Sequence, residues 1–197
     1  GEAAWGGRGP AVSETKRLRQ THGAAQVLQA VCLRLPQGQL TAVIGPNGAG
    51  KSTALSLIGR LMPMTSGSVR IEGQDITTTA SDALARVMAI LRQDNQSALR
   101  LTVRDLVAFG RFPHSKGRLT EEDRVHVDAA LNYLKLQPPS ERFLDELSGG
   151  QRPRAYIAMV LCQNTPYILF AAPLNNLHMA HSVCMMKLLR PAVPDAG

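Results

Sequence analysis

A two-residue alternation of apolar and polar side chains runs through residues 26–35 and predicts a β-strand. A Pro-Gln-Gly turn at residues 36–38 separates it from the short apolar stretch 40–44, which predicts a second strand. Residues 68–72 predict a further short strand, which Gly73 closes. Strands therefore precede helices in the first part of the chain.

Apolar residues recur at helical spacing farther along the chain. Residues 54–60 predict a helix soon after the 40–44 stretch. Thr102 is expected to begin another helix, with Val103, Leu106 and Val107 on one face. Thr120 is followed by three acidic residues, which suit the first turn of a helix that continues through residues 125–134. This mixture of strands and helices predicts an α/β fold.

A glycine-rich loop, GPNGAGKST, lies between the predicted strand 40–44 and the predicted helix 54–60. It fits the pattern G-x-x-x-x-G-K-[ST], in which backbone N–H groups and the start of the following helix converge on phosphate. Lys51 supplies a mobile positive charge, and Ser52 offers a hydroxyl to Mg²⁺. The alternative interpretation is an ordinary glycine turn. The expected nucleotide-binding residues are Gly45, Pro46, Asn47, Gly48, Ala49, Gly50, Lys51, Ser52 and Thr53.

A second glycine motif, LSGGQ, stands at residues 147–151 and is expected to open another helix. Ser148 suits the N-cap position. Gly149 and Gly150 leave N–H groups uncovered, so that a γ-phosphate can approach the positive end of the helix. Taken alone, the motif is equally compatible with a serine-glycine turn.

Together the two motifs resemble the ATP-binding-cassette (ABC) ATPases. The resemblance implies a P-loop α/β fold with a mostly parallel core sheet, helices on both faces and a helical signature subdomain, here incomplete at both ends. It also implies a homodimer or a paired ABC subunit, in which Ser148, Gly149, Gly150 and Gln151 act in trans on ATP and Mg²⁺ held by the other subunit.

Several longer stretches are similar to the ATPase subunits of ferric-siderophore importers, over about residues 26–190. These stretches are residues 90–95, 101–113, 152–161, 173–177 and 181–190. The resemblance places Gln93 at the magnesium ion and the attacking water, and His22 where an aromatic ring stacks on adenine. It implies transmembrane permease subunits as partners and a peripheral location on the cytoplasmic face of the cell membrane, or in the cytosol when unassembled. It also implies that the helical insert meets the permease, although packing on the core explains its apolar faces equally well.

The positions that carry two acids in this family are Ala171 and Ala172 in this chain. The family's aspartate holds the magnesium shell and its glutamate orients and deprotonates water, and a methyl side chain does neither. We therefore expect ATP binding with hydrolysis near background, and we assign no catalytic residue. The alternatives are a truncated non-catalytic ABC remnant and a nucleotide-responsive binding module.

Further departures point the same way. His178 stands where the family carries an aspartate, and the strand that carries the family's switch histidine is not found after residue 190. Pro153 replaces a glutamine near the start of the predicted signature helix, where it would kink or shift that start. His22 offers less stacking area than the family's aromatic residue, which lowers the expected affinity for adenine.

Residues 1–22 show no two-residue alternation and are expected to form a disordered tail. A single ATP-binding domain is predicted over residues 23–190. Its nucleotide core comprises residues 23–92 and 148–190, its helical insert residues 93–147, and a short tail follows at residues 191–197.

The formal charge of +7 permits a nucleic-acid interpretation. Aromatic residues make up only 4% of the chain, and the positive residues are mostly spread along it, apart from a short cluster at residues 16–19. Nucleic-acid binding is therefore a minor alternative, and no specific nucleic-acid partner is expected. No apolar run approaches the roughly 18 residues that span a bilayer.

Overall fold

The computed structural model describes residues 11–22, 25–36, 48–92 and 100–171. These residues belong to two compact units, one within residues 1–80 and one within residues 81–192. The division falls between Ala80 and Ser81. The single ATP-binding domain over residues 23–190 stays a prediction.

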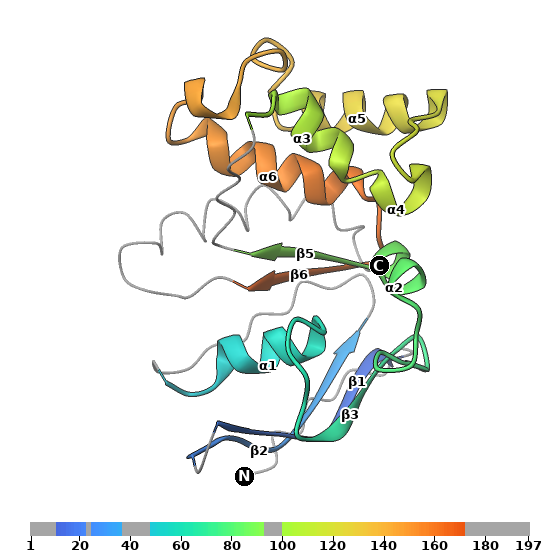
Figure 1. Ribbon diagram of the computed structural model, residues 1–197, viewed down its shortest axis with the longest axis vertical. Coiled ribbons are helices and arrows are strands. Elements are labelled where there is room, and N and C mark those ends of the chain that lie inside the picture. The colour runs from blue at the N-terminus through green and yellow to red at the C-terminus, as the bar shows by residue number, and fades with distance from the viewer. Residues whose placement is uncertain (1–10, 23–24, 37–47, 93–99, 172–197) are drawn as a thin grey trace. The chain divides into compact units, whose positions relative to one another are not determined.

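The first unit contains an antiparallel sheet and one helix (Figure 1). The sheet has the order β2-β1-β3-β4. Its strands are β1 (Ala11–His22), β2 (Ala25–Pro36), β3 (Ser66–Ile71) and β4 (Gln74–Asp75), and the helix is α1 (Lys51–Ile58). β2 and β3 confirm the strands predicted at residues 26–35 and 68–72, and α1 confirms the helix predicted at 54–60, with an earlier start.

The prediction of a tail over residues 1–22 is wrong for Ala11–His22, which form strand β1. The sequence signal is hidden because the pairing of β1 with both neighbours slips. The register shifts between Thr15 and Leu18 on the β2 side and between Lys16 and Arg19 on the β3 side. Such a bulge inserts an extra residue and breaks the two-residue alternation on which the prediction depended.

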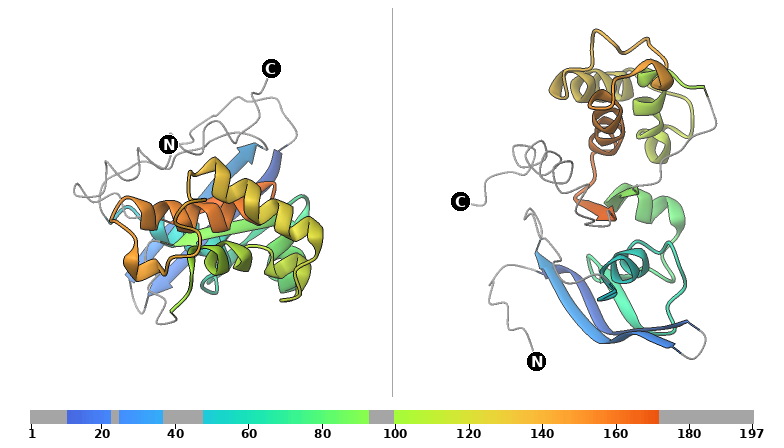
Figure 2. Two further views of the ribbon diagram at one scale, coloured as in Figure 1. Left: turned by 90° about the horizontal axis from the view of Figure 1, so that it is seen from above. Right: turned by 90° about the vertical axis from the view of Figure 1, so that its left-hand side faces the viewer.

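One face of this sheet is buried and carries Leu18, Val69 and Ile71. Helix α1 contacts β1 and β2, and Figure 2 shows it lying over one face of the sheet. The helix buries Ala54, Leu57 and Ile58. The core of the first unit therefore lies between α1 and the sheet.

The second unit contains a two-stranded parallel sheet, of β5 and β6, and a group of helices (Figure 1). Helices α3, α5 and α6 contact one another and share an apolar core that includes Val107, Leu131 and Ile157. The elements in chain order are α2 (Ser81–Val87), β5 (Met88–Arg92), α3 (Val103–Phe109), α4 (Phe112–Ser115), α5 (Glu121–Tyr133), the 3₁₀ turn η1 (Leu144–Glu146), α6 (Gln151–Cys162) and β6 (Tyr167–Ala171).

The two helix starts predicted at Thr102 and Thr120 are confirmed. Each threonine is an N-cap whose side chain accepts a hydrogen bond from a backbone N–H three residues on, at Asp105 and Asp123 respectively. Each aspartate in turn accepts from the backbone N–H of its threonine. Two orphan donors are thus satisfied at each start, which is why these helices begin where they do.

The described residues contain only part of the predicted parallel core sheet, namely β5 and β6. The four-stranded antiparallel sheet was not predicted. The strand expected at residues 40–44 and the tail at residues 191–197 lie outside the described residues.

A buried ion pair joins the end of α3 to the start of α5. The Arg111 Nε donates to Asp123 Oδ1 at 2.8 Å, and the two side chains are 6% and 4% exposed. Arg111 Nη1 also donates to the Cys162 carbonyl at the end of α6. The Thr120 backbone N–H and the Arg111 guanidinium hold the pKa of Asp123 down, from 3.8 to about 2, against the opposing effect of burial. The Arg111 guanidinium therefore joins the segment after α3 to both α5 and α6.

Asp123→Asn should destabilise the folded chain most at neutral pH. It keeps an oxygen acceptor for Thr120 but leaves the buried Arg111 charge unpaired, an arrangement that costs about 3–5 kcal/mol. Because the folded pKa is lowered, the carboxylate's contribution, roughly 2.5 kcal/mol, is fully present above pH 4 and is lost as pH falls through about 2. Urea unfolding at pH 7, 4 and 2.5 should show that the difference in free energy of unfolding between wild type and variant shrinks as the pH falls.

The exposed neighbour Glu122 provides the matched control in the same helical turn. Glu122→Gln should change the free energy of unfolding by less than about 0.5 kcal/mol at each pH. An Asp123→Asn penalty that stays constant from pH 7 to 2.5 would contradict a role for the charge.

Candidate functional site

The described part of the glycine-rich loop, residues 48–53, leads into α1. Gly48 and Gly50 have φ angles of +81° and +79°, in the left-handed region that favours glycine. Gly50 is the N-cap of α1, and its carbonyl accepts from the Ala54 N–H at 2.8 Å. The first turn contains no acidic side chain. The geometry therefore leaves the positive end of the α1 dipole open to an anion.

The two glycines meet different surroundings. A Cβ at Gly50 would lie 2.6 Å from Leu28 Cδ2 and 3.1 Å from the Val27 carbonyl oxygen, so this turn packs closely against β2. A Cβ at Gly48 would meet nothing within 4 Å. The loop is thus fixed on one side by β2 and is open at Gly48.

The structure describes only some of the predicted nucleotide-binding residues. Lys51 is the first residue of α1 and is half-buried, Ser52 is exposed, and Thr53 follows in the same turn. His22 ends β1, where its backbone pairs with Ala25 in β2. Gly45, Pro46, Asn47 and Gln93 lie outside the described residues.

The second glycine motif precedes helix α6. The prediction that Ser148 is the N-cap is wrong, because α6 begins at Gln151 and its N-cap is Gly150. The Ser148 carbonyl accepts from the N–H groups of Gln151 and Arg152, at 2.9 and 3.1 Å. The Gln151 side chain folds back and accepts from the Ser148 N–H at 3.1 Å. The motif thus forms a turn before the helix.

Pro153 is compatible with this later helix start. It is the third residue of α6, a position whose N–H has no acceptor within an α-helix. Of the two expected effects of Pro153, a kink or a shifted helix start, the start of α6 at Gln151 agrees with the shifted start.

The glycines of this motif are exposed, and neither has a positive φ. A Cβ at Gly149 or Gly150 would meet nothing within 4 Å. The first turn of α6 contains no acidic residue. Neither backbone conformation nor packing among the described residues explains two consecutive glycines here, and an anion approaching the helix start would have room.

Of the two alanine positions, the structure describes one, which ends strand β6. Ala171 is the last residue of this strand and pairs in parallel with Arg92, the last residue of β5. Parallel neighbours end at the same edge of a sheet, so the chain leaves β5 toward Gln93 beside the place where β6 ends. Ala172 lies outside the described residues. Ala171 supplies no carboxylate at this edge.

A pairing that sequence reasoning missed joins residues 100–104 to residues 140–144. The Leu144 N–H donates to the Leu101 carbonyl and the Val103 N–H to the Arg142 carbonyl, each at 3.0 Å. The Arg100 guanidinium lies 4.1 Å from the centre of the Phe143 ring, a cation–π distance. The segment that follows the Gln93 region is thus attached to the segment that leads to the second glycine motif.

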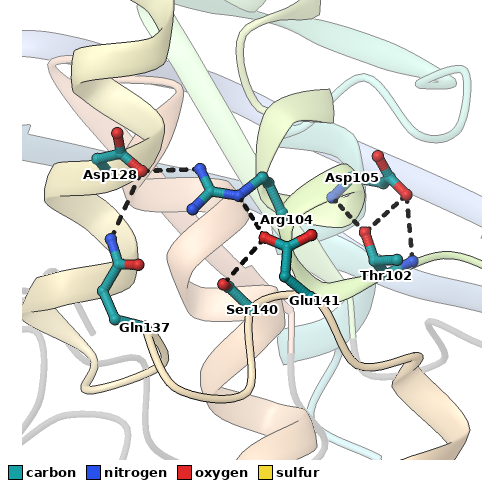
Figure 3. A network of polar contacts seen from close by, with 7 residues as sticks. All are labelled: Thr102, Arg104, Asp105, Asp128, Gln137, Ser140 and Glu141. Carbon is teal, nitrogen blue, oxygen red and sulfur yellow. Dashed lines mark hydrogen bonds and ion pairs between the residues drawn. The ribbon is translucent and has the colours of Figure 1, made fainter.

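Figure 3 shows how Arg104 reinforces this attachment. Its guanidinium donates to Asp128 in α5 at 2.7 Å and to Glu141 at 2.8 Å, while Thr102 and Asp105 cap α3 beside it. The hydrogen bonds to Asp128 and Glu141 raise the pKa of Arg104 above its usual value. No local pattern in the sequence signals this cluster, because its members are far apart in the chain.

In the part of the chain that the structure describes, no helix is long and apolar enough to cross a membrane. The same residues contain no group of three or more His, Cys, Asp or Glu side chains able to hold a metal ion.

Comparison with known proteins identifies similar chains. Residues 28–175 match the family described as ABC transporter. Over 184 residues the chain is 50% identical to the petrobactin import ATP-binding protein YclP of Bacillus subtilis (strain 168), covering 93% of this chain and 73% of the relative. Over 165 residues it is 53% identical to the petrobactin import ATP-binding protein FatE of Bacillus anthracis, covering 84% of this chain and 66% of the relative.

A solved structure supports the fold. The ADP conformation of an ATP-binding cassette of an ABC transporter superposes with a TM-score of 0.76 over 93% of this chain and 78% of that one, at 24% sequence identity. The predicted α/β fold of the ABC type is confirmed.

Alanine at Gly50 should destabilise the first unit more than alanine at Gly48. Both substitutions carry the cost of a left-handed backbone at a non-glycine residue, about 1–2 kcal/mol. Only Gly50→Ala also forces a Cβ against Leu28 and the Val27 carbonyl, which adds about 1–3 kcal/mol of overpacking. Urea unfolding of the two variants measures the difference, and equal losses would show that the contact with β2 is unimportant.

Proposed function

The chain belongs to the ABC transporter family, and from that premise we propose that it is the ATP-binding subunit of an importer for iron(III)-siderophore complexes. Both similar Bacillus proteins are petrobactin import ATP-binding proteins by name, which supports this substrate class. The chain spans 73% and 66% of those two relatives, so the proposal concerns a subunit of which the described residues are a part.

The observation that carries the proposal is the turn into α1. Polyphosphate fits there because the loop is open at Gly48, the helix start points its positive end outward and no acid lies in the first turn. Lys51 adds positive charge at the first helical position. Ser52, together with Gln93, would hold Mg²⁺ beside the phosphates, and the metal would supply charge stabilisation.

Binding and cleavage of ATP are separable in this chain. The residues that hold phosphate are present, whereas the positions of the family's two acids are Ala171 and Ala172. The missing general base alone lowers the rate of hydrolysis by about 10²–10⁴-fold. This absence also favours a second candidate function, a subunit that responds to ATP binding without turning it over.

The open glycines before α6 support a composite site. Since nothing within the described chain occupies the space beside Gly149 and Gly150, a triphosphate held by a second ABC subunit can approach the start of α6. We propose a homodimer or a paired subunit of this kind, bound to transmembrane permease subunits at the cytoplasmic face of the membrane.

Calorimetry with ATP and Mg²⁺ should detect binding to the wild-type chain, and the free energy of unfolding should rise by about 2.7 kcal/mol at 100 times the dissociation constant. Lys51→Gln should abolish both effects, whereas Lys135→Gln, at an exposed lysine, should preserve them.

Turnover of ATP by the wild-type chain should stay below about 1 s⁻¹, at or under the low end of the usual enzyme range. Ala171→Asp with Ala172→Glu should raise it by about 10²–10⁴-fold. Rapid hydrolysis by the wild type would refute impaired cleavage, and an absence of binding by folded protein would refute the proposal itself.

Gly150→Leu should block dimer formation driven by ATP without harming the free chain. Because a Cβ at this position meets nothing, the free energy of unfolding should change by less than about 0.5 kcal/mol. Sedimentation velocity with ATP and Mg²⁺ should show a dimer for the wild type and a monomer for the variant. Ala129→Leu, which also adds an exposed leucine to a helix, should dimerise normally. A Gly150→Leu chain that still dimerises would contradict the composite site.

A further inference from the structure

Three cations are concentrated on one stretch of strand β1. Lys16, Arg17 and Arg19 are all exposed, while Leu18 between them is fully buried. In a regular strand, the side chains of Lys16 and Arg17 would lie on opposite faces of the sheet. The exposure of both therefore requires a local departure from regular pairing.

That departure is the bulge in β1. The pairing with β3 slips between Lys16 and Arg19, and Arg17 has a φ of +48°, in the left-handed region that strains an arginine. Gly67 in β3 makes the bulge possible. A Cβ at Gly67 would lie 2.6 Å from the Arg17 carbonyl oxygen and 2.8 Å from that of Lys16. Bulges re-aim side chains, and strained backbone that a structure maintains is a reason to seek a function.

The surroundings of the bulge are also basic. Arg34 and Arg70 lie opposite Glu14 on the two neighbouring strands, and the Arg34 Nε is 3.4 Å from the Glu14 carboxylate. The Glu14 carboxylate on this part of the sheet is thus already paired with an arginine. Among the described residues, no carboxylate lies within ion-pair distance of Lys16, Arg17 or Arg19.

We propose that Lys16, Arg17 and Arg19, the basic bulge, form a docking surface for the anionic phospholipid headgroups of a membrane. The charge of the surface is complementary to phosphate, and a β-sheet face is broad enough to present several cations to a flat array of headgroups. A nucleic acid fits less well, because the described strands of this sheet carry no phenylalanine, tyrosine or tryptophan on which bases could stack. The inference adds to the proposed function a second contact with the membrane, besides the permease.

Sedimentation of the full chain with vesicles tests the surface. Vesicles of phosphatidylcholine and phosphatidylglycerol at a ratio of about 7:3 should bind the wild type, and vesicles of phosphatidylcholine alone should not. Each basic residue near an anionic surface contributes about fivefold in affinity, so Lys16→Gln, Arg17→Gln and Arg19→Gln together should weaken binding roughly 100-fold. Binding should also weaken as salt rises, since salt screens these charges.

The matched control removes the same charge elsewhere. Arg118, Arg124 and Lys135 are exposed residues of the second unit, and Lys135, like Arg17, has a positive φ. The triple Gln variant at these positions should reduce vesicle affinity less than about fivefold. An equal loss in both triple variants would show attraction by net charge alone and would overturn the proposal.

Arg17→Gly separates lost charge from lost structure. Glycine suits the left-handed backbone at this position, so the thermal midpoint should not fall, whereas vesicle affinity should fall about fivefold. An unchanged affinity in this folded variant would overturn the role of the bulge.

Two further outcomes overturn the proposal. The first is a wild-type chain that ignores anionic vesicles at low salt. The second is a basic-bulge variant that loses retention on DNA or RNA while keeping vesicle binding, which would assign the surface to nucleic acid. Calorimetry with ATP on the same samples tests ATP binding separately, because Lys51 is unchanged in every variant. The proposal of ATP binding and the proposal of lipid docking can therefore fail independently.

Discussion

The start of helix α1 depends on a turn in which Gly48 and Gly50 adopt left-handed conformations, and its first turn carries no acidic side chain. At Gly50 this turn is also a packing constraint, since the side chain of Leu28 and the Val27 carbonyl occupy the space of a Cβ. The loop is therefore positioned by strand β2 of the same unit. A preformed cluster of backbone donors needs little reorganisation to meet an anion, which is why such a turn favours phosphate.

In the second unit, polar contacts hold the segment that leads to α6 and the end of that helix. Residues 140–144 pair with residues 100–104, and Arg104 joins that pairing to α5 through Asp128. Deeper in the unit, Arg111 and Asp123 link α3 and α5 to the end of α6. These polar contacts hold the segment that leads to α6, and the end of α6 itself, beside the apolar core of the unit. A ligand bound at Gly150 would therefore contact a helix whose other end is anchored to its neighbours.

Local chemistry made the helix starts at Thr102 and Thr120 predictable, because a cap and its acid lie three residues apart. Strand β1 was missed because its bulge at Arg17 breaks the alternation that identifies a strand. Arg111 and Arg104 gave no signal, since their partners lie 12 to 51 residues away. The glycine motifs were recognisable because phosphate binding requires their residue types at that particular spacing. The N-cap of α6 was misplaced although Ser148 does contact the helix start, because its carbonyl accepts from Gln151 and Arg152, the first two residues of α6, while the N-cap position itself belongs to Gly150.

The glycines whose surroundings are described can be sorted by what a Cβ would meet. At Gly50, Gly67 and Gly110 it would meet a neighbouring chain segment at 2.6 Å or less, so packing accounts for these three. Gly48, Gly73 and Gly117 have positive φ angles, so conformation accounts for them. Gly149 and Gly150 have neither explanation. Gly150 is the N-cap of α6 and Gly149 precedes it, positions at which neither packing nor a left-handed backbone among the described residues requires glycine. Their absence of side chains is best explained by an occupant that comes from outside the chain and must approach the helix start closely.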